Sequence, residues 1–206
     1  RNVLIHGQTL RKDQIGRLKT LDVMPSLFPM HTFYWGDWHK ESVLGPERAA
    51  YISPTRDVLD AGMIFSSHHD APVANPDSMR VLGATVSRVT RSGEVLGHDQ
   101  RVTPYEGLKA ITIWPAYQHF EEKVKGSIEV GKQADFVILS ADPLTVDPLT
   151  IADIKVLETI NDGKTVFEHP DKAPKPDAIV GGDRDEHGCI PSAGYQWCEK
   201  LGECVR

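Results

Sequence analysis

Residues 63–70 have the sequence MIFSSHHD, in which a short apolar run leads into two histidines and an aspartate. Short apolar runs bounded by polar residues are typical of buried strands. The run from Met63 to Phe65 therefore predicts a strand, which is followed by His68, His69 and Asp70. Side chains just past the carboxyl ends of parallel strands converge where α/β folds bind their ligands. This stretch predicts such an edge.

Two earlier apolar runs end in the same way. Asn2 to Ile5 predicts a buried strand that ends at His6, and Val23 to Phe28 predicts an extended segment that leads to His31. His6, His31 and Asp70 thus share one topological position. Ordinary polar residues at strand ends remain the alternative interpretation of all three.

Helical patterns separate and follow these strands. We expect a helix at about residues 11–21 and a second one that is opened by Ser53 and Pro54 and closed by Gly62. Further helices are expected after Asn75-Pro76 and after Thr103, where TPYE has capping-box spacing. The alternation of strands with helices predicts an α/β fold with a parallel sheet covered by helices. The aromatic segment after His31 is expected to be a loop, with Phe33, Tyr34, Trp35 and Trp38.

The pattern changes to all-β from Gly126 onward. Strands are expected at 127–130 and at 134–140, and Asn161-Asp162-Gly163 predicts a hairpin turn. We therefore expect three parts, which are 1–122, 123–169, and a polar linker with a cysteine-containing tail at 170–206.

The composition excludes several classes of function. The chain has 206 residues, with 23 Lys and Arg against 29 Asp and Glu, which gives a formal net charge of −6. A nucleic-acid or anionic-membrane surface is not expected from this balance. The apolar runs are also far shorter than the ~20 residues that span a bilayer. The expected partners therefore include no nucleic acid and no membrane.

All three cysteines, Cys189, Cys198 and Cys204, fall within the last eighteen residues. Such crowding favours a disulfide that staples a small appendage, which requires an oxidising compartment. The pairings considered are Cys198 with Cys204 and Cys189 with Cys198, and the sequence does not choose between them. A zinc site that also uses His187 is the alternative. The tail suggests export to the periplasm or the medium, with a cytoplasmic location as the alternative.

Four segments resemble a known family. They are LIHGQ at 4–8, PSLFPMH at 25–31, SSHHDAPV at 66–73 and, more specifically, KGSIEVGKQADFVIL at 125–139. Together they resemble the second half of the metal-dependent amidohydrolase superfamily, close to its YtcJ-like branch (amidohydrolase family 3). The resemblance covers about residues 1–168.

The resemblance implies the C-terminal half of a (β/α)8 TIM-type barrel, with part of a small β-sandwich and the cysteine-containing tail. It implies that His6, His31 and Asp70 bind a divalent metal, foremost zinc, as one or two ions, after the fifth, sixth and eighth barrel strands. Imidazole and carboxylate are ligands that suit zinc. The implied reaction is hydrolysis of a non-peptide carbon–nitrogen bond in a small amide or N-acyl substrate. Asp70 would carry the proton from water to the leaving nitrogen.

The family's His-x-His pair and its bridging residue on the fourth strand do not occur in these 206 residues. We therefore expect the N-terminal half of the same protein as a partner and no activity from this segment alone. A non-catalytic fragment or subunit is the competing interpretation, and homo-oligomerisation is left open.

Substrate contacts are expected from four residues near the metal site. His68 and His69 stand where related enzymes usually have small residues, so one of them is expected to face the pocket, with ordinary loop histidines as the alternative. Phe33 and Trp35 belong to the aromatic segment, which either lines a pocket or packs against its neighbours. The other histidines, His39 among them, are interpreted as surface or structural residues.

Overall fold

The computed structural model describes residues 1–172 and 184–205. The chain divides into two compact units, residues 1–169 and residues 170–206. Each unit is described by itself. Most of the polar linker expected at 170–185 lies outside the described residues.

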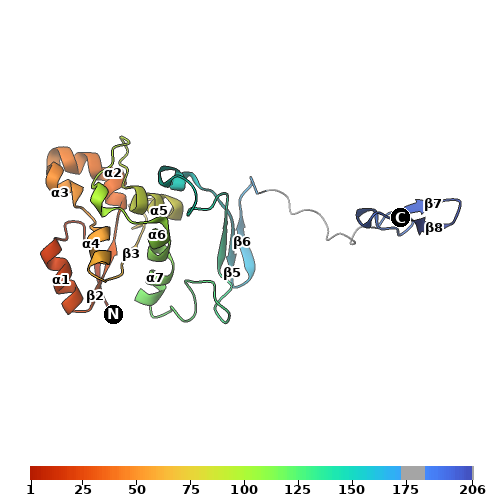
Figure 1. Cartoon of the computed structure of the whole chain (residues 1–206), viewed down its shortest axis with the longest axis horizontal. Coiled ribbons are helices and arrows are strands. Elements are labelled where there is room, and N and C mark those ends of the chain that lie inside the picture. Colours follow the sequence, from red (N-terminus) through yellow and green to blue (C-terminus); the bar gives the residue numbers. More distant parts are fainter. Residues whose placement is uncertain (173–183, 206) are drawn as a thin grey trace. The chain divides into compact units, whose positions relative to one another are not determined.

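A parallel sheet forms the first part of the larger unit (Figure 1). Its strands are β1 (Asn2–His6), β2 (Val23–Leu27) and β3 (Ser66–Ser67), in the order β1-β2-β3. Pairing of β1 with β2 ends at His6 and Leu27, and β2 pairs with β3 at Leu27 and Ser67. The three strands therefore end side by side, as the sequence predicted.

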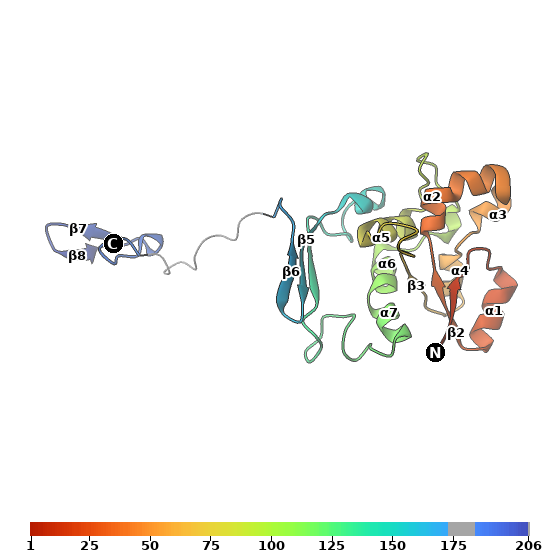
Figure 2. The same ribbon diagram turned by 180° about the vertical axis from the view of Figure 1, so that it is seen from behind.

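Helices cover both sides of this sheet (Figures 1 and 2). Contacts with the sheet are made by α1 on one side and by α5, α6 and α7 on the other. No helix among the described residues has the length and apolar composition needed to cross a membrane. The helical elements of this unit are α1 (Lys12–Thr20), α2 (Met30–Trp38), the π-helical η1 (His39–Val43), α3 (Pro46–Ala50), α4 (Thr55–Asp60), α5 (Ser78–Ser87), the 3-10 helix η2 (His98–Gln100), α6 (Pro104–Ile111), α7 (Ile113–Gln118) and the 3-10 helix η3 (Pro148–Asp153).

Local side-chain hydrogen bonds fix where two of these helices begin. The Asp77 carboxylate accepts from the backbone N–H groups of Met79 and Arg80, so Asp77 caps α5, and the expected cap at Asn75-Pro76 is wrong. An Asp side chain in this position satisfies N–H groups that a helix start otherwise leaves unpaired. The capping box of α6 is confirmed.

Glu106 is bound from two directions at the start of α6. Its carboxylate accepts from the Thr103 backbone N–H at 2.7 Å and from Arg56 Nη2 at 2.7 Å. Partial burial opposes the shift, but the hydrogen bonds from Arg56 and Thr103 prevail and lower the pKa of Glu106 from 4.5 to about 2. The ionised carboxylate therefore stabilises the fold above about pH 4.5, and this contribution is lost as the pH falls towards 2.

Replacing Glu106 by alanine is expected to lower the free energy of unfolding by about 1–2 kcal/mol near neutral pH, because a cap and an ion pair are lost together. Urea unfolding at several pH values measures the effect. The difference from wild type should shrink as the pH falls through the acid range. A difference that stays constant down to about pH 2 would contradict the prediction, because the contribution of Glu106 would then not depend on its ionisation.

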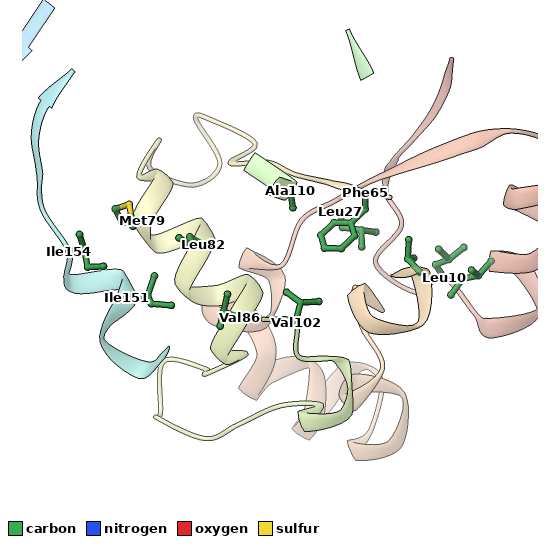
Figure 3. Close-up of a cluster of buried hydrophobic side chains, with 12 residues drawn as sticks. Leu10, Leu27, Phe65, Met79, Leu82, Val86, Val102, Ala110, Ile151 and Ile154 are labelled. Carbon is green, nitrogen blue, oxygen red and sulfur yellow. The ribbon is translucent and has the colours of Figure 1, made fainter. Parts of the chain in front are cut away.

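The second sheet is antiparallel, and η3 lies between its first two strands in the chain. Its strands are β4 (Phe136–Leu139), β5 (Val156–Asn161) and β6 (Lys164–Glu168), in the order β4-β5-β6. Ile151 of η3 packs against Leu82 and Val86 of α5 in the main core (Figure 3). Gly83 permits this approach, because a Cβ there would lie 2.9 Å from the Ala152 Cβ.

The all-β prediction is correct in part. The hairpin at Asn161-Asp162-Gly163 is confirmed, and so is a strand within 134–140. The strand expected at 127–130 is wrong, because Ile128 and Val130 are exposed and pair with no strand among the described residues. The three strands of residues 123–169 form one antiparallel layer.

Two predictions in the parallel part are also wrong. The strand expected from Met63 to Phe65 begins only at Ser66, because β2 offers pairing partners to Ser66 and Ser67 alone. Phe65 is nevertheless fully buried and contacts the Trp114 ring. The aromatic segment expected as a loop is the helix α2. Its residues Phe33, Tyr34 and Trp35 pack against a buried cluster that includes Phe28, whereas Trp38 is exposed.

The smaller unit holds a hairpin of β7 (Gln196–Cys198) and β8 (Glu203–Val205), preceded by the 3-10 helix η4 (Pro191–Ala193). A disulfide joins Cys189 to Cys204, and Cys198 is free. Both pairings considered from the sequence are therefore wrong, because the hairpin brings its far strand back towards Cys189. The zinc alternative is not met either, because Cys189 and Cys204 are joined in the disulfide and cannot act as thiolate ligands.

This pairing makes a simple chemical prediction. Denatured but unreduced protein is expected to titrate with one free thiol per chain, and peptide mapping should place it at Cys198. Three free thiols would contradict the disulfide. A Cys198→Ser variant provides the control, because its unreduced form should then show no free thiol.

Candidate functional site

His6 and Asp70 face each other at the carboxyl edge of the parallel sheet. The His6 Nε2 atom lies 3.7 Å from the Asp70 Oδ2 atom, and both side chains are more than one-third exposed. His6 is the last residue of β1, and Asp70 follows β3 by three residues. Both residues adopt a positive φ, +67° and +55°, at the point where the chain leaves the sheet.

The second nitrogen of His6 meets His68. His6 Nδ1 lies 2.9 Å from His68 Nε2, and His68 Nδ1 lies 2.9 Å from the Ser26 hydroxyl. These contacts join residues from or just past all three strands. Burial and the nearby His6 imidazole lower the pKa of His68 to about 4, so this ring is neutral at neutral pH.

Phe28 is the common neighbour of three imidazoles. It directly follows β2 and is almost fully buried. Its ring centroid lies 5.6 Å from that of His6, 4.6 Å from that of His31 and 5.3 Å from that of His68, on which it stacks. Sequence reasoning did not select Phe28, because an aromatic residue at the end of an apolar run looks like ordinary core.

His31 lies in the first turn of α2, with its ring centroid 5.6 Å from that of His6. His6 thus lies near both His31 and Asp70. The His31 Nδ1 atom is buried and has no hydrogen-bond partner among the described residues. Burial, reinforced by the imidazoles of His6 and His39, lowers the pKa of His31 to about 4.

His39 is part of the same neighbourhood. It is 8% exposed, its ring lies 6.3 Å from that of His31, and Gln8 Nε2 lies 3.2 Å from its Nε2 atom. The sequence could have revealed it, because a spacing of eight residues places His31 and His39 on one side of a helix. That signal was missed when the segment was expected to be a loop.

Of the other residues predicted to contact substrate, only Trp35 has its ring beside that of a site histidine. The Trp35 ring lies 5.9 Å from that of His31, beside the site. Phe33 instead packs against Tyr34 and under the Arg80 guanidinium. His69 Nε2 lies 3.2 Å from the Ser78 hydroxyl.

The ligand-capable atoms of His6, His68 and Asp70 lie within 4.8 Å of one another, and within the described part of the chain this is the one such group. Two nitrogen donors and a carboxylate suit a borderline divalent cation such as zinc. His31 stands outside this group. A groove of about 670 Å³ lies between α6–α7 and β4–β5. It is separate from the candidate site, because His6, His31, His39 and His68 do not line it.

The arrangement of histidines and an aspartate at the ends of parallel strands accords with the comparisons with known proteins. Over residues 1–167 the sequence matches the amidohydrolase family, which is more than half of the chain. The chain belongs to the amidohydrolase family. It is 31% identical to the N-substituted formamide deformylase of Arthrobacter pascens over 169 residues, which are 80% of this chain and 30% of that protein. It is 26% identical to the putative amidohydrolase YtcJ of Bacillus subtilis over 168 residues, which are 80% of this chain and 32% of that protein.

Solved structures of amidohydrolases and metal-dependent hydrolases share the fold of this chain. A metal-dependent hydrolase from Pyrococcus horikoshii aligns with a TM-score of 0.59 at 28% identity, over 71% of this chain and 30% of that chain. An amidohydrolase from Thermotoga maritima aligns with a TM-score of 0.57 at 22% identity, over 81% and 37%. The chain thus spans about one-third of the length of these relatives.

Proposed function

We propose that this chain is the C-terminal part of a metal-dependent hydrolase of non-peptide carbon–nitrogen bonds. The observation that carries the proposal is the pair of His6 Nε2 and Asp70 Oδ2, which face each other at 3.7 Å across the ends of a parallel sheet. Membership of the amidohydrolase family supports the reaction class. The substrate proposed is a small amide or N-acyl compound, and a relative named for N-substituted formamides makes that class the first to test.

We place β1, β2 and β3 as the last three strands of a (β/α)8 barrel. In such a barrel β3 is the eighth strand, and direct pairing makes β2 the seventh and β1 the sixth. The expectation that His6 follows the fifth strand and His31 the sixth does not fit this pairing. It would need a further strand between β2 and β3, and residues 28–65 form helices and loops instead.

His6 and Asp70 fit a divalent metal ion, with zinc first among the candidates and one or two ions left open. Their separation of 3.7 Å suits two ligands that each bind at ~2.0–2.2 Å. When bound, such an ion lowers the pKa of water and polarises the scissile carbonyl. His31 was expected as a third ligand. We assign it instead to the substrate, because its ring lies beside that of His6 and it stands outside the ligand group.

The chain's own groups have distinct tasks in this proposal. Asp70 is partly exposed and accepts the proton of the attacking water, then passes it to the leaving nitrogen, as a general base and acid. His31 is neutral at neutral pH and is available for a hydrogen bond to a polar substrate atom. Trp35 lies beside it and offers an apolar surface.

The N-terminal segment of the same protein is the proposed partner that completes the site, and homo-oligomerisation is left open. The competing proposal is a non-catalytic fragment or subunit, and the chain spans about one-third of the length of the relatives it matches. For location, we propose export, supported by the Cys189–Cys204 disulfide, which an oxidising compartment preserves.

The test compares residues 1–206 with the intact polypeptide that its gene encodes. Both are assayed on N-formyl and N-acyl amines after treatment with a chelator and after addition of Zn²⁺. We expect Zn²⁺-dependent hydrolysis by the intact polypeptide and none by residues 1–206 alone. Inactivity of the intact polypeptide on every amide would support the non-catalytic alternative, and activity of residues 1–206 alone would show that no partner segment is needed.

A further inference from the structure

Both ring nitrogens of His68 already have partners inside the protein. Its Nε2 atom lies 2.9 Å from His6 Nδ1, and its Nδ1 atom lies 2.9 Å from the Ser26 hydroxyl. A ring with both nitrogens engaged has no lone pair left for an ion. The geometric grouping of His68 with His6 and Asp70 therefore has another explanation than direct ligation.

The proton positions along this chain of contacts are linked. A neutral imidazole carries one N–H, so a hydrogen bond between two imidazoles needs a donor nitrogen on one ring and an acceptor on the other. If His6 Nε2 keeps its lone pair towards Asp70, His6 Nδ1 carries the hydrogen and donates to His68 Nε2. His68 then carries its hydrogen on Nδ1 and donates to Ser26.

We propose that His68 is a positioning residue that holds the His6 imidazole in its Nδ1–H form, so that the Nε2 lone pair faces Asp70 and is open to a divalent ion. Histidine ligands commonly donate their second N–H to a protein acceptor, which fixes the tautomer and the ring orientation. Here that acceptor is a second imidazole. The inference rests on the proposed function of the same site and assigns a task to a residue that the implied ligand set leaves unused.

Two contacts make His68 a rigid acceptor. Its ring stacks on Phe28 with an interplanar angle of 7°, and Phe28 is 1% exposed. Ser26, the last group of the series, is 4% exposed and lies within β2, where it pairs with Ile5 and Ser66. The ring therefore cannot turn freely away from His6.

The first experiment needs no metal. Two-bond ¹H–¹⁵N spectra of the imidazoles in residues 1–206, recorded at mildly alkaline pH, report which nitrogen of His6 carries the hydrogen. We expect the Nδ1–H form in wild type and its loss or mixing in His68→Ala. His68→Gln, whose amide oxygen can accept the same bond, should restore the Nδ1–H form. His69→Ala is the matched control, because its imidazole contacts Ser78 instead.

The second experiment measures Co²⁺ and Zn²⁺ affinity by competition with a coloured chelator. His68→Ala should weaken binding by about 10–100-fold, as the loss of a supporting hydrogen bond to a ligand does, with the visible Co²⁺ spectrum unchanged in shape. His68→Gln should recover most of the affinity, and His69→Ala should retain it.

The outcomes separate this inference from the proposed function. An Nε2–H form of His6 in wild type, or a tautomer that does not respond to His68→Ala, would overturn the inference. A Co²⁺ spectrum that changes its coordination in His68→Ala would also overturn it, by making His68 a ligand. If the tautomer responds but wild type binds neither ion, the positioning role stands and the proposed metal function fails.

Discussion

Replacing Asp70 by asparagine is expected to reduce Zn²⁺-dependent amide hydrolysis by the intact polypeptide about 10²–10⁴-fold. Asparagine keeps the size and one carbonyl oxygen but cannot accept and return a proton. It also removes the negative charge that faces His6 Nε2 at 3.7 Å. The measurement is kcat/KM at saturating Zn²⁺, where the loss should appear mainly in kcat if proton transfer is the step affected.

Asp99→Asn is the control, because it removes a fully exposed carboxylate outside the site. Zn²⁺ affinity must be measured in parallel, since part of the Asp70→Asn effect comes from a weaker ligand. An Asp70→Asn variant that binds Zn²⁺ and retains more than about one-tenth of wild-type kcat would remove Asp70 from the role of proton carrier.

Replacing Arg88 by methionine is expected to lower the free energy of unfolding by about 3–5 kcal/mol. Arg88 is fully buried, and its guanidinium donates to the backbone carbonyls of Leu96, Ser53 and Ile52 at 2.7–3.0 Å. Burial, with Arg101 nearby, lowers the pKa of Arg88 to about 10, so the group stays charged at neutral pH. Methionine fills similar volume but cannot donate a hydrogen bond to any of these carbonyls. The Ser53 carbonyl would keep its bond from the Thr55 backbone N–H, whereas those of Ile52 and Leu96 would lose the guanidinium donor.

Chemical denaturation followed by circular dichroism measures this loss. Arg91→Met is the matched control, because Arg91 is exposed and lies three residues further along the chain. Arg88→Lys should fall between the two, since an ammonium keeps the charge but cannot match a planar fork. A destabilisation below about 1 kcal/mol for Arg88→Met would mean that water replaces the guanidinium.

Sequence patterns predicted most of the parallel part of the fold. Apolar runs located β1 and β2, and a capping box located the start of α6. The patterns failed where pairing or packing outweighed local composition. Residues 127–130 alternate like a strand but have no partner among the described residues. The aromatic segment is a helix in which three of the aromatic side chains pack against the core cluster that includes Phe28.

The candidate site was predictable at the level of its strand ends. His6 and Asp70 could be chosen from the sequence alone, because each stands at or just past the end of an apolar run. The hydrogen bonds of His68 and the burial of His39 were not, because they depend on side-chain directions across strands far apart in the chain. The prediction of the cysteine pairing failed for the same reason, because the pairing depends on how the β7–β8 hairpin folds.

The positive φ angles of His6 and Asp70 cost stability at the candidate site. A residue with a side chain typically costs of order 1–3 kcal/mol in such a conformation, less for Asp and His than for branched residues, and glycine would relieve it. Selection for thermal robustness alone would therefore favour glycine at both positions. Directed evolution that screens this chain only for solubility or heat resistance should drift towards such replacements and lose the two groups that face each other. Stabilised variants therefore need a functional screen from the first round.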